Sequence, residues 1–191
     1  MTTLASVDWT KLPAPEDDGA AAHLPGLRLP SVPLQSTDGS MVDLAALSGT
    51  VVVYAYPMTG RPDTPLPEGW DMIPGARGCT PQSCAFRDHF ADLRALGVDC
   101  LFGLSTQTPA YQAEAAERLH LPFPLLSDAG FVLTHALKLP TFETGGMRLL
   151  KRLTLILTDG TISKAFYPVF PPDQNAEIVV DWLRGQEQHE G

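Results

Sequence analysis

The sequence predicts an α/β protein with a central mixed β-sheet and helices on both of its faces. Two continuous apolar runs, "TVVVYAYP" (50–57) and "VDCLFGLS" (98–105), are typical of strands buried on both sides. A helical pattern follows each run, and crossover helices between buried strands indicate parallel pairing. A later run, "KRLTLILTDGTISKAFYPVF" (151–170), has Asp159-Gly160 near its middle and predicts two antiparallel strands.

The other elements follow from local signals. Asp38-Gly39 separates two short apolar runs, which predicts an N-terminal β-hairpin. The segment 80–97 predicts a helix with Thr80 as its N-cap, Pro81 in its first turn and a stop at Gly97. We also expect a helix over 108–120, a short strand over 123–128, a short helix over 130–139 and an amphipathic helix over 174–186.

This order of elements has the shape of the thioredoxin-like fold, with the N-terminal hairpin added. A length of 191 residues favours one domain. We expect that domain over 27–186, after an irregular arm over 1–26 and before a frayed tail over 187–191. Residues 58–78 form a loop rich in proline and glycine, and a loop of this length in a compact domain usually has a function.

Composition narrows the class of protein. A formal net charge of −9 without a basic stripe argues against binding to nucleic acid or to anionic membranes. The chain shows no signal-peptide pattern and no run of about 20 apolar residues. Three cysteines do not form the framework of a secreted disulfide-rich domain. We therefore expect a cytoplasmic protein that binds neither nucleic acid nor membrane.

The stretch "IPGARGCTPQSCAFRDHFADL" holds two of the cysteines, Cys79 and Cys84. Cys79 lies at the expected helix start, where free N–H groups and the helix dipole favour the nucleophilic thiolate. Five residues of intact helix separate the two Cα atoms by roughly 8–9 Å. A disulfide needs about 7 Å or less, so bridging the pair requires the first turns to unwind.

Other roles for these thiols stay open at this point. A buried cysteine is often a small hydrophobic residue, and this is the expected role of Cys100 in its apolar strand. The five histidines lack metal-ligand spacing with the cysteines, and His89 follows Cys84 by five positions. We therefore expect no metal site.

Four stretches together resemble a peroxiredoxin of the Q-type group, also called bacterioferritin comigratory proteins. They are "VVVYAYP", "GCTPQSCAFRDHFADLRALGVDCLFGLST", "FPLLSD" and "KRLTLIL", and the resemblance covers roughly residues 27–186. It implies a thiol-dependent peroxidase that reduces hydrogen peroxide or organic hydroperoxides without a cofactor. Two other activities remain open, a thiol–disulfide oxidoreductase and a redox sensor, although the Cys-x-x-Cys pattern of oxidoreductases is missing.

The resemblance also implies roles for individual residues. Cys79 would attack the O–O bond and become a sulfenic acid, and Cys84 would condense with it to an intramolecular disulfide. Thioredoxin or a similar dithiol would then restore both thiols. Arg152 matches the family's arginine, which would stabilise the thiolate and the leaving oxygen. Because the disulfide is intramolecular, we expect a monomer.

The sequence departs from the family pattern of proline, three residues, threonine, two residues and cysteine. Pro57 matches the proline and would shield the site, but Ala76 stands where the threonine belongs. An insertion within 58–78 therefore splits the motif. We expect Thr59 to supply the missing hydroxyl, with Thr64 as the other candidate.

The insertion itself has two possible arrangements. It could bring Trp70 or Met72 to the site, or it could be a surface excursion. The stretch "FYPVFPP" (166–172) could wall the site or simply pack in the core.

Overall fold

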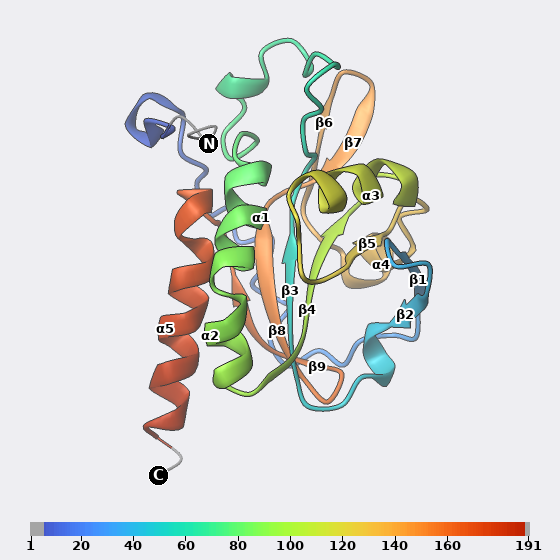
Figure 1. Ribbon diagram of the computed structural model, residues 1–191, viewed down its shortest axis with the longest axis vertical. Helices are drawn as coiled ribbons and strands as arrows, with labels where there is room; N and C mark the ends of the chain where they lie inside the picture. Colours follow the sequence, from blue (N-terminus) through green and yellow to red (C-terminus); the bar gives the residue numbers. More distant parts are fainter. Residues whose placement is uncertain (1–5, 190–191) are drawn as a thin grey trace.

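The computed structural model describes residues 6–189, and its main sheet is mixed, has seven strands and carries helices on both faces (Figure 1). Its strands are β1 (Pro33–Ser36), β2 (Met41–Asp43), β3 (Thr50–Ala55), β4 (Val98–Ser105), β5 (Leu125–Ser127), β8 (Leu153–Thr158) and β9 (Thr161–Phe166). They lie in the order β2-β1-β5-β4-β3-β8-β9. β3 pairs parallel with β4 and antiparallel with β8, which confirms the expected mixed sheet.

The helices are α1 (Cys79–Asp88), α2 (Phe90–Ala95), α3 (Pro109–Arg118), α4 (Val132–Leu137) and α5 (Asn175–Glu187). The single helix expected over 80–97 is two helices that meet at His89. The expectation that Thr80 caps the helix is wrong. Gly78 is the N-cap with a φ of 114°, and Cys79 is already helical. The chain enters the helix in a left-handed conformation, which favours glycine over a residue with a side-chain cap.

Side chains of β3 alternate between two apolar cores, as the buried run predicted. Val52 and Tyr54 pack with residues of α1, α2 and α5, whereas Val51 and Val53 pack with α4 and the segment before β1. Tyr54 stacks on Phe86 of α1 with 4.5 Å between ring centroids. Figure 1 shows α1, α2 and α5 side by side along one face of the sheet.

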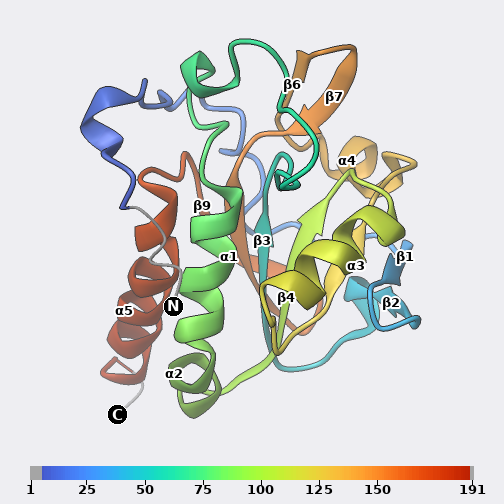
Figure 2. The ribbon, with the colours of Figure 1, turned by 45° about the horizontal axis from the view of Figure 1, so that its top comes forward.

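A second, two-stranded sheet was not expected from the sequence. It consists of β6 (Thr141–Thr144) and β7 (Met147–Leu150), joined at Gly145-Gly146. This hairpin and the insertion share a third apolar core. Its members are Met58, Trp70, Ala76 and Leu149, with Ile73, Tyr111 and Phe142 packed against them. Figure 2 shows the insertion arching beside β6 and β7 at the same end of the molecule. The insertion is therefore packed into the fold.

The segment before β1 contains one short 3-10 turn, Trp9–Lys11, and then runs along β9. There the Gly26 N–H donates to the Ile162 carbonyl at 2.7 Å. The expected arm over 1–26 and tail over 187–191 include positions 1–5 and 190–191, which lie outside the described residues. None of the helices described is long and apolar enough to cross a membrane.

Candidate active site

Cys79 begins α1 and is 3% exposed, at the edge of a cavity of about 470 Å³. Gly78 permits this arrangement, since a Cβ there would lie 2.6 Å from Pro172 Cγ and 2.8 Å from Trp9 Cη2. The N-terminal segment and the loop before α5 therefore close tightly around the helix start. From the stretch 166–172, Pro172 packs against the helix start, although no residue of this stretch lines the cavity.

Arg152 comes to Cys79 through strand pairing. Leu153 pairs with Ala55, so Arg152 lies at the carboxyl end of β3, where the chain turns towards α1. Its guanidinium is buried, and Nη2 lies 3.3 Å from Cys79 Sγ. The same nitrogen donates to the carbonyls of Gly75 at 3.2 Å and Ala76 at 3.1 Å. The structure therefore brings a permanent cation into contact with the thiol.

A buried chain of amide groups holds this arginine from behind. Arg152 Nη1 donates to Gln82 Oε1 at 2.5 Å, and Gln82 Nε2 donates to Asn175 Oδ1 at 2.9 Å. The Thr154 hydroxyl donates to the same Asn175 oxygen at 2.7 Å. The sequence reasoning missed Gln82 and Asn175. A glutamine three residues after Cys79 lies on the same helix face, and that spacing could have drawn attention to it.

Neither of the two threonines that could supply the missing hydroxyl lines this cavity. The cavity is lined by Met58 and Gly60 but not by Thr59, whose buried hydroxyl has no hydrogen-bond partner among residues 6–189. Thr64 is exposed, and its hydroxyl contacts Asp63. The role of Thr59 as the source of the peroxide-binding hydroxyl stays a prediction.

Two other polar groups lie close to Cys79. Ala76 contributes its carbonyl oxygen, 3.8 Å from Cys79 Sγ, and Thr80 lines the cavity. Pro57 is buried at the end of β3, directly before the cavity residue Met58. Of the two insertion residues expected at the site, Trp70 and Met72, Trp70 lines the cavity.

Cys84 lies in the interior of the same helix and is 7% exposed. Burial raises the pKa of the Cys84 thiol, and the charges of Arg87 and Arg118 partly oppose this effect. All three cysteines are unbridged, and α1 is intact. Cys100 is half-buried against the core that contains α4, as expected for a packing residue.

A second cavity, of about 440 Å³, lies against Arg152. Asp18 occupies its polar side, where Lys151 Nζ lies 2.9 Å and the Tyr167 hydroxyl 2.8 Å from the carboxylate. These hydrogen bonds, the one from Lys151 first, lower the pKa of Asp18 to about 2. This cluster ties the N-terminal segment to the loop that carries the catalytic candidate Arg152. Across residues 6–189 no group of three or more His, Cys, Asp or Glu side chains could hold a metal ion.

Comparisons with known proteins show the family to which the chain is similar. The protein family described as Redoxin matches residues 24–180. Peroxiredoxin Q of the Gentiana triflora chloroplast is 29% identical over 157 residues, which cover 81% of this chain and 64% of that protein. Peroxiredoxin Bcp of Escherichia coli is 29% identical over 160 residues, covering 81% of this chain and 92% of that protein. The chain thus spans less than two thirds of the length of the Gentiana relative.

Solved structures show the same fold. The peroxidoxin BcpB of Mycobacterium tuberculosis superposes with a TM-score of 0.68 at 25% identity, covering 85% of this chain and 98% of that one. A cysteine-to-serine mutant of Xylella fastidiosa PrxQ gives a TM-score of 0.70 at 19% identity, covering 86% and 98%. A Xanthomonas campestris bacterioferritin comigratory protein, whose alkyl peroxide reduction activity has been studied, gives a TM-score of 0.65 at 21% identity. The match covers 83% of this chain and 97% of that one.

Proposed function

The chain belongs to the Redoxin family, and on that premise we propose that it is a thiol-dependent peroxidase with Cys79 as its nucleophile. The observation that carries the proposal is the 3.3 Å contact between Arg152 Nη2 and Cys79 Sγ at the edge of a cavity. A guanidinium keeps its charge at any physiological pH, so it offers the sulfur a permanently charged donor. The thiolate is the form that attacks a peroxide.

In the first step, Cys79 sulfur attacks one oxygen of a hydroperoxide ROOH. An S–O bond forms, the O–O bond breaks, and the sulfur is oxidised to a sulfenic acid. The other oxygen leaves with the electron pair and takes a proton to become ROH. Arg152 stabilises the charge that develops on this oxygen. The N–H groups of Cys79 and Thr80 have no acceptor within α1, and they can hold the peroxide where the hydroxyl is missing.

In the second step, Cys84 sulfur attacks the sulfenic acid, and water leaves as the disulfide forms. An intact α1 holds the two Cα atoms roughly 8–9 Å apart, so the first turns of the helix unwind in each cycle. A dithiol then supplies two electrons and two protons, which restore both thiols. We place thioredoxin in this role.

We also propose that the protein works as a monomer in the cytoplasm, without nucleic acid or membrane partners. The net charge of −9 supports the last point. An intramolecular disulfide requires no second subunit, which supports the monomer.

The test is peroxide-dependent NADPH consumption with thioredoxin and thioredoxin reductase. Wild type should turn over, and Cys79→Ser should fall to the background rate. Mass spectrometry under non-reducing conditions should find a Cys79–Cys84 disulfide in a single chain after peroxide treatment. Equal slow rates for wild type and Cys79→Ser would reject the proposal. Reduction of insulin without peroxide turnover would instead favour a thiol–disulfide oxidoreductase.

A further inference from the structure

The cavity beside Cys79 is much larger than hydrogen peroxide requires. Its volume is about 470 Å³. A water molecule occupies about 30 Å³ in the liquid, and hydrogen peroxide has only one more heavy atom. Cavities of roughly 300–1,000 Å³ bind organic molecules. The size therefore points to a substrate with an organic group attached to its O–O bond.

The walls of this cavity are mostly apolar. They include Val7, Trp9, Met58, Leu66, Trp70 and Pro81. The two charged side chains at the cavity already have partners. Arg77 pairs with Asp71 at 2.7 Å, and Asp173 accepts a hydrogen bond from Trp9 Nε1 at 2.9 Å. A substrate group that fits here is uncharged and apolar.

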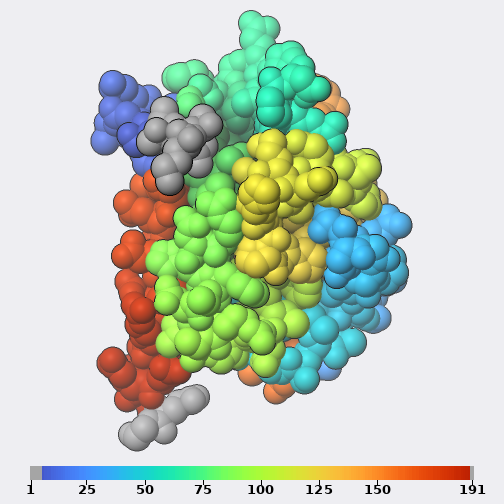
Figure 3. Space-filling view, viewed as in Figure 1, coloured from blue at the N-terminus to red at the C-terminus, as the bar shows by residue number. Residues whose placement is uncertain are grey.

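The insertion supplies the wall opposite the helix start, through Leu66 and Trp70. Trp70 is buried and packs on Phe142 of β6, with 6.2 Å between ring centroids. Leu66 is 40% exposed, and its Cδ2 would lie 3.5 Å from a Cβ added at Gly60. Figure 3 shows the insertion next to the N-terminal segment at the upper end of the molecule. Both segments therefore enclose the space beside Cys79.

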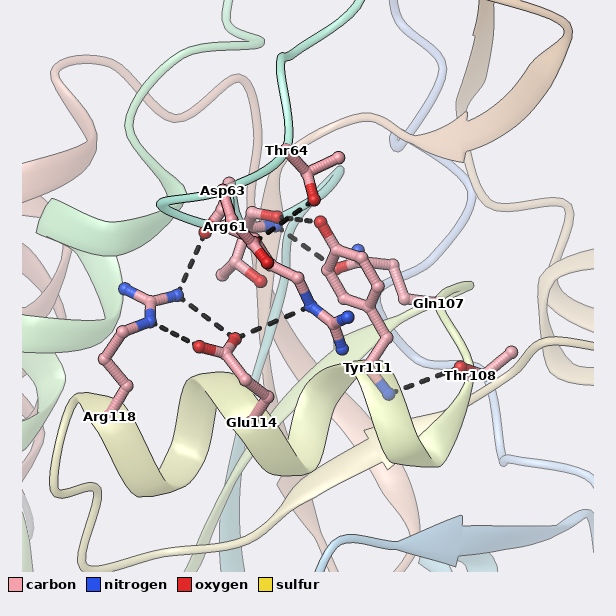
Figure 4. A network of polar contacts seen from close by, with 10 residues as sticks. Arg61, Asp63, Thr64, Gln107, Thr108, Tyr111, Glu114 and Arg118 are labelled. Atoms are coloured by element: carbon pink, nitrogen blue, oxygen red, sulfur yellow. Dashed lines mark hydrogen bonds and ion pairs between the residues drawn. The ribbon is translucent and has the colours of Figure 1, made fainter.

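Hydrogen bonds to α3 fix the start of the insertion (Figure 4). The Tyr111 hydroxyl donates to the Thr59 carbonyl at 2.8 Å, and Arg118 Nη2 donates to the Gly60 carbonyl at 2.9 Å. Arg118 is held in turn by Glu114, with 2.7 Å between Nε and Oε1. The Arg61 guanidinium lies 4.1 Å from the centre of the Tyr111 ring. Because the wall is already in place, a substrate loses little binding energy in ordering it.

We propose that Leu66 and Trp70 select hydroperoxides that carry a compact, uncharged apolar group, aromatic or branched, over hydrogen peroxide. The inference rests on the proposed peroxidase function. The O–O bond lies at Cys79, and the organic group lies against the insertion. Binding energy from this non-reacting part of the substrate then lowers the barrier to attack by the thiolate.

The test measures single-turnover oxidation of prereduced protein by cumene hydroperoxide and by hydrogen peroxide, without a reductant. Wild type should react faster with cumene hydroperoxide. Leu66→Asp places a charge in the wall at a partly exposed position, where folding is retained. It should lower the rate constant for cumene hydroperoxide about tenfold and change that for hydrogen peroxide less than twofold. Trp70→Leu should also lower the rate constant for cumene hydroperoxide relative to that for hydrogen peroxide.

Met72→Asp is the matched control. Met72 is on the same insertion, is 70% exposed and does not line the cavity, so its substitution should leave both rate constants unchanged. Suppose that Leu66→Asp keeps Cys79-dependent oxidation but leaves the ratio of the two rate constants, cumene hydroperoxide over hydrogen peroxide, unchanged. That result would overturn the proposed selection. Loss of both rates in parallel would also overturn it. Absence of Cys79-dependent oxidation in wild type would reject the peroxidase itself.

Discussion

The two cysteines of α1 lie in opposite surroundings, although both are buried and they share one short helix. Cys79 contacts the guanidinium of Arg152 and adjoins a cavity. Cys84 lines none of the cavities described here, and burial raises the pKa of its thiol. Low exposure therefore says little about reactivity by itself. The contact with charge and the access to a cavity distinguish a nucleophile from a protected thiol.

The difference has a structural origin. The surroundings of Cys79 come from segments far apart in sequence, among them Trp9, Arg152 and Pro172. Cys84 lies in the helix interior and is buried there. Unwinding the first turns would release Cys84 and at the same time take Cys79 away from its cation. In the proposed catalytic cycle, disulfide formation would therefore change the surroundings of both thiols.

Removal of the cation should have the largest effect. Arg152→Met should reduce the rate of sulfenic acid formation roughly 10³-fold, about 4 kcal/mol, because the thiolate and the leaving oxygen both lose their charged donor. Trapping of the sulfenic acid with dimedone in single-turnover reactions measures this rate. Arg152→Lys keeps the charge but not the fork of donors, so it should recover only part of the rate. A rate within threefold of wild type in Arg152→Met would contradict the role of Arg152.

The helix start should be nearly as sensitive, through stability. In Gly78→Ala the new Cβ would meet Pro172 and Trp9, at a φ of 114° that alanine tolerates poorly. We expect a loss of about 3 kcal/mol in the free energy of unfolding, from overpacking and from the left-handed conformation together. Urea unfolding measures it.

Gly97→Ala is the matched control, since its φ of 83° is also positive but nothing lies within 4 Å of the new Cβ. It should lose only about 1 kcal/mol. Equal losses in the two variants would show that the packing around Gly78 contributes nothing.

These contrasts also show what the sequence could reveal. The strand 98–105 and the turn at Asp159-Gly160 were predicted because they depend on local apolar runs and turn residues. The hairpin of β6 and β7 was missed, because its stability comes from packing against Trp70 and Met58 of the insertion. The left-handed entry at Gly78 also depends on distant contacts, with Pro172 and Trp9. The expected helix start pointed to Cys79 and the resemblance to Q-type peroxiredoxins pointed to Arg152, but only the sheet register shows how they meet.

The glutamine behind the arginine should have an intermediate effect. Gln82→Met removes the acceptor for Arg152 Nη1, while Asn175 keeps its hydrogen bond from Thr154. The guanidinium then loses its orientation, and sulfenic acid formation should slow roughly tenfold. Gln82→Glu retains an acceptor at the same place and should restore most of the rate. A rate in Gln82→Met equal to that of wild type would show that the carbonyls of Gly75 and Ala76 position Arg152 without help.

The protected state of Cys84 predicts the smallest effect, a shift in the pH at which its thiolate forms. Because burial raises the pKa of this thiol, the folded protein keeps its proton through a pH range where the unfolded chain loses it. The neutral Cys84 thiol therefore makes its full contribution to the free energy of unfolding below the pKa of the unfolded chain, about 8.5. This contribution is lost as the pH rises through the higher pKa of the folded protein.

Thiolate absorbance of a Cys79→Ser, Cys100→Ser variant measures this shift, with the additional Cys84→Ala variant subtracted to remove the tyrosine signal. The midpoint in buffer should lie above the midpoint in urea. Arg118→Ala should move the folded midpoint higher still, because the Arg118 charge opposes the effect of burial. Coincident midpoints in buffer and urea would mean that Cys84 is as open to solvent as an unfolded thiol. The contrast with Cys79 would then rest on Arg152 alone.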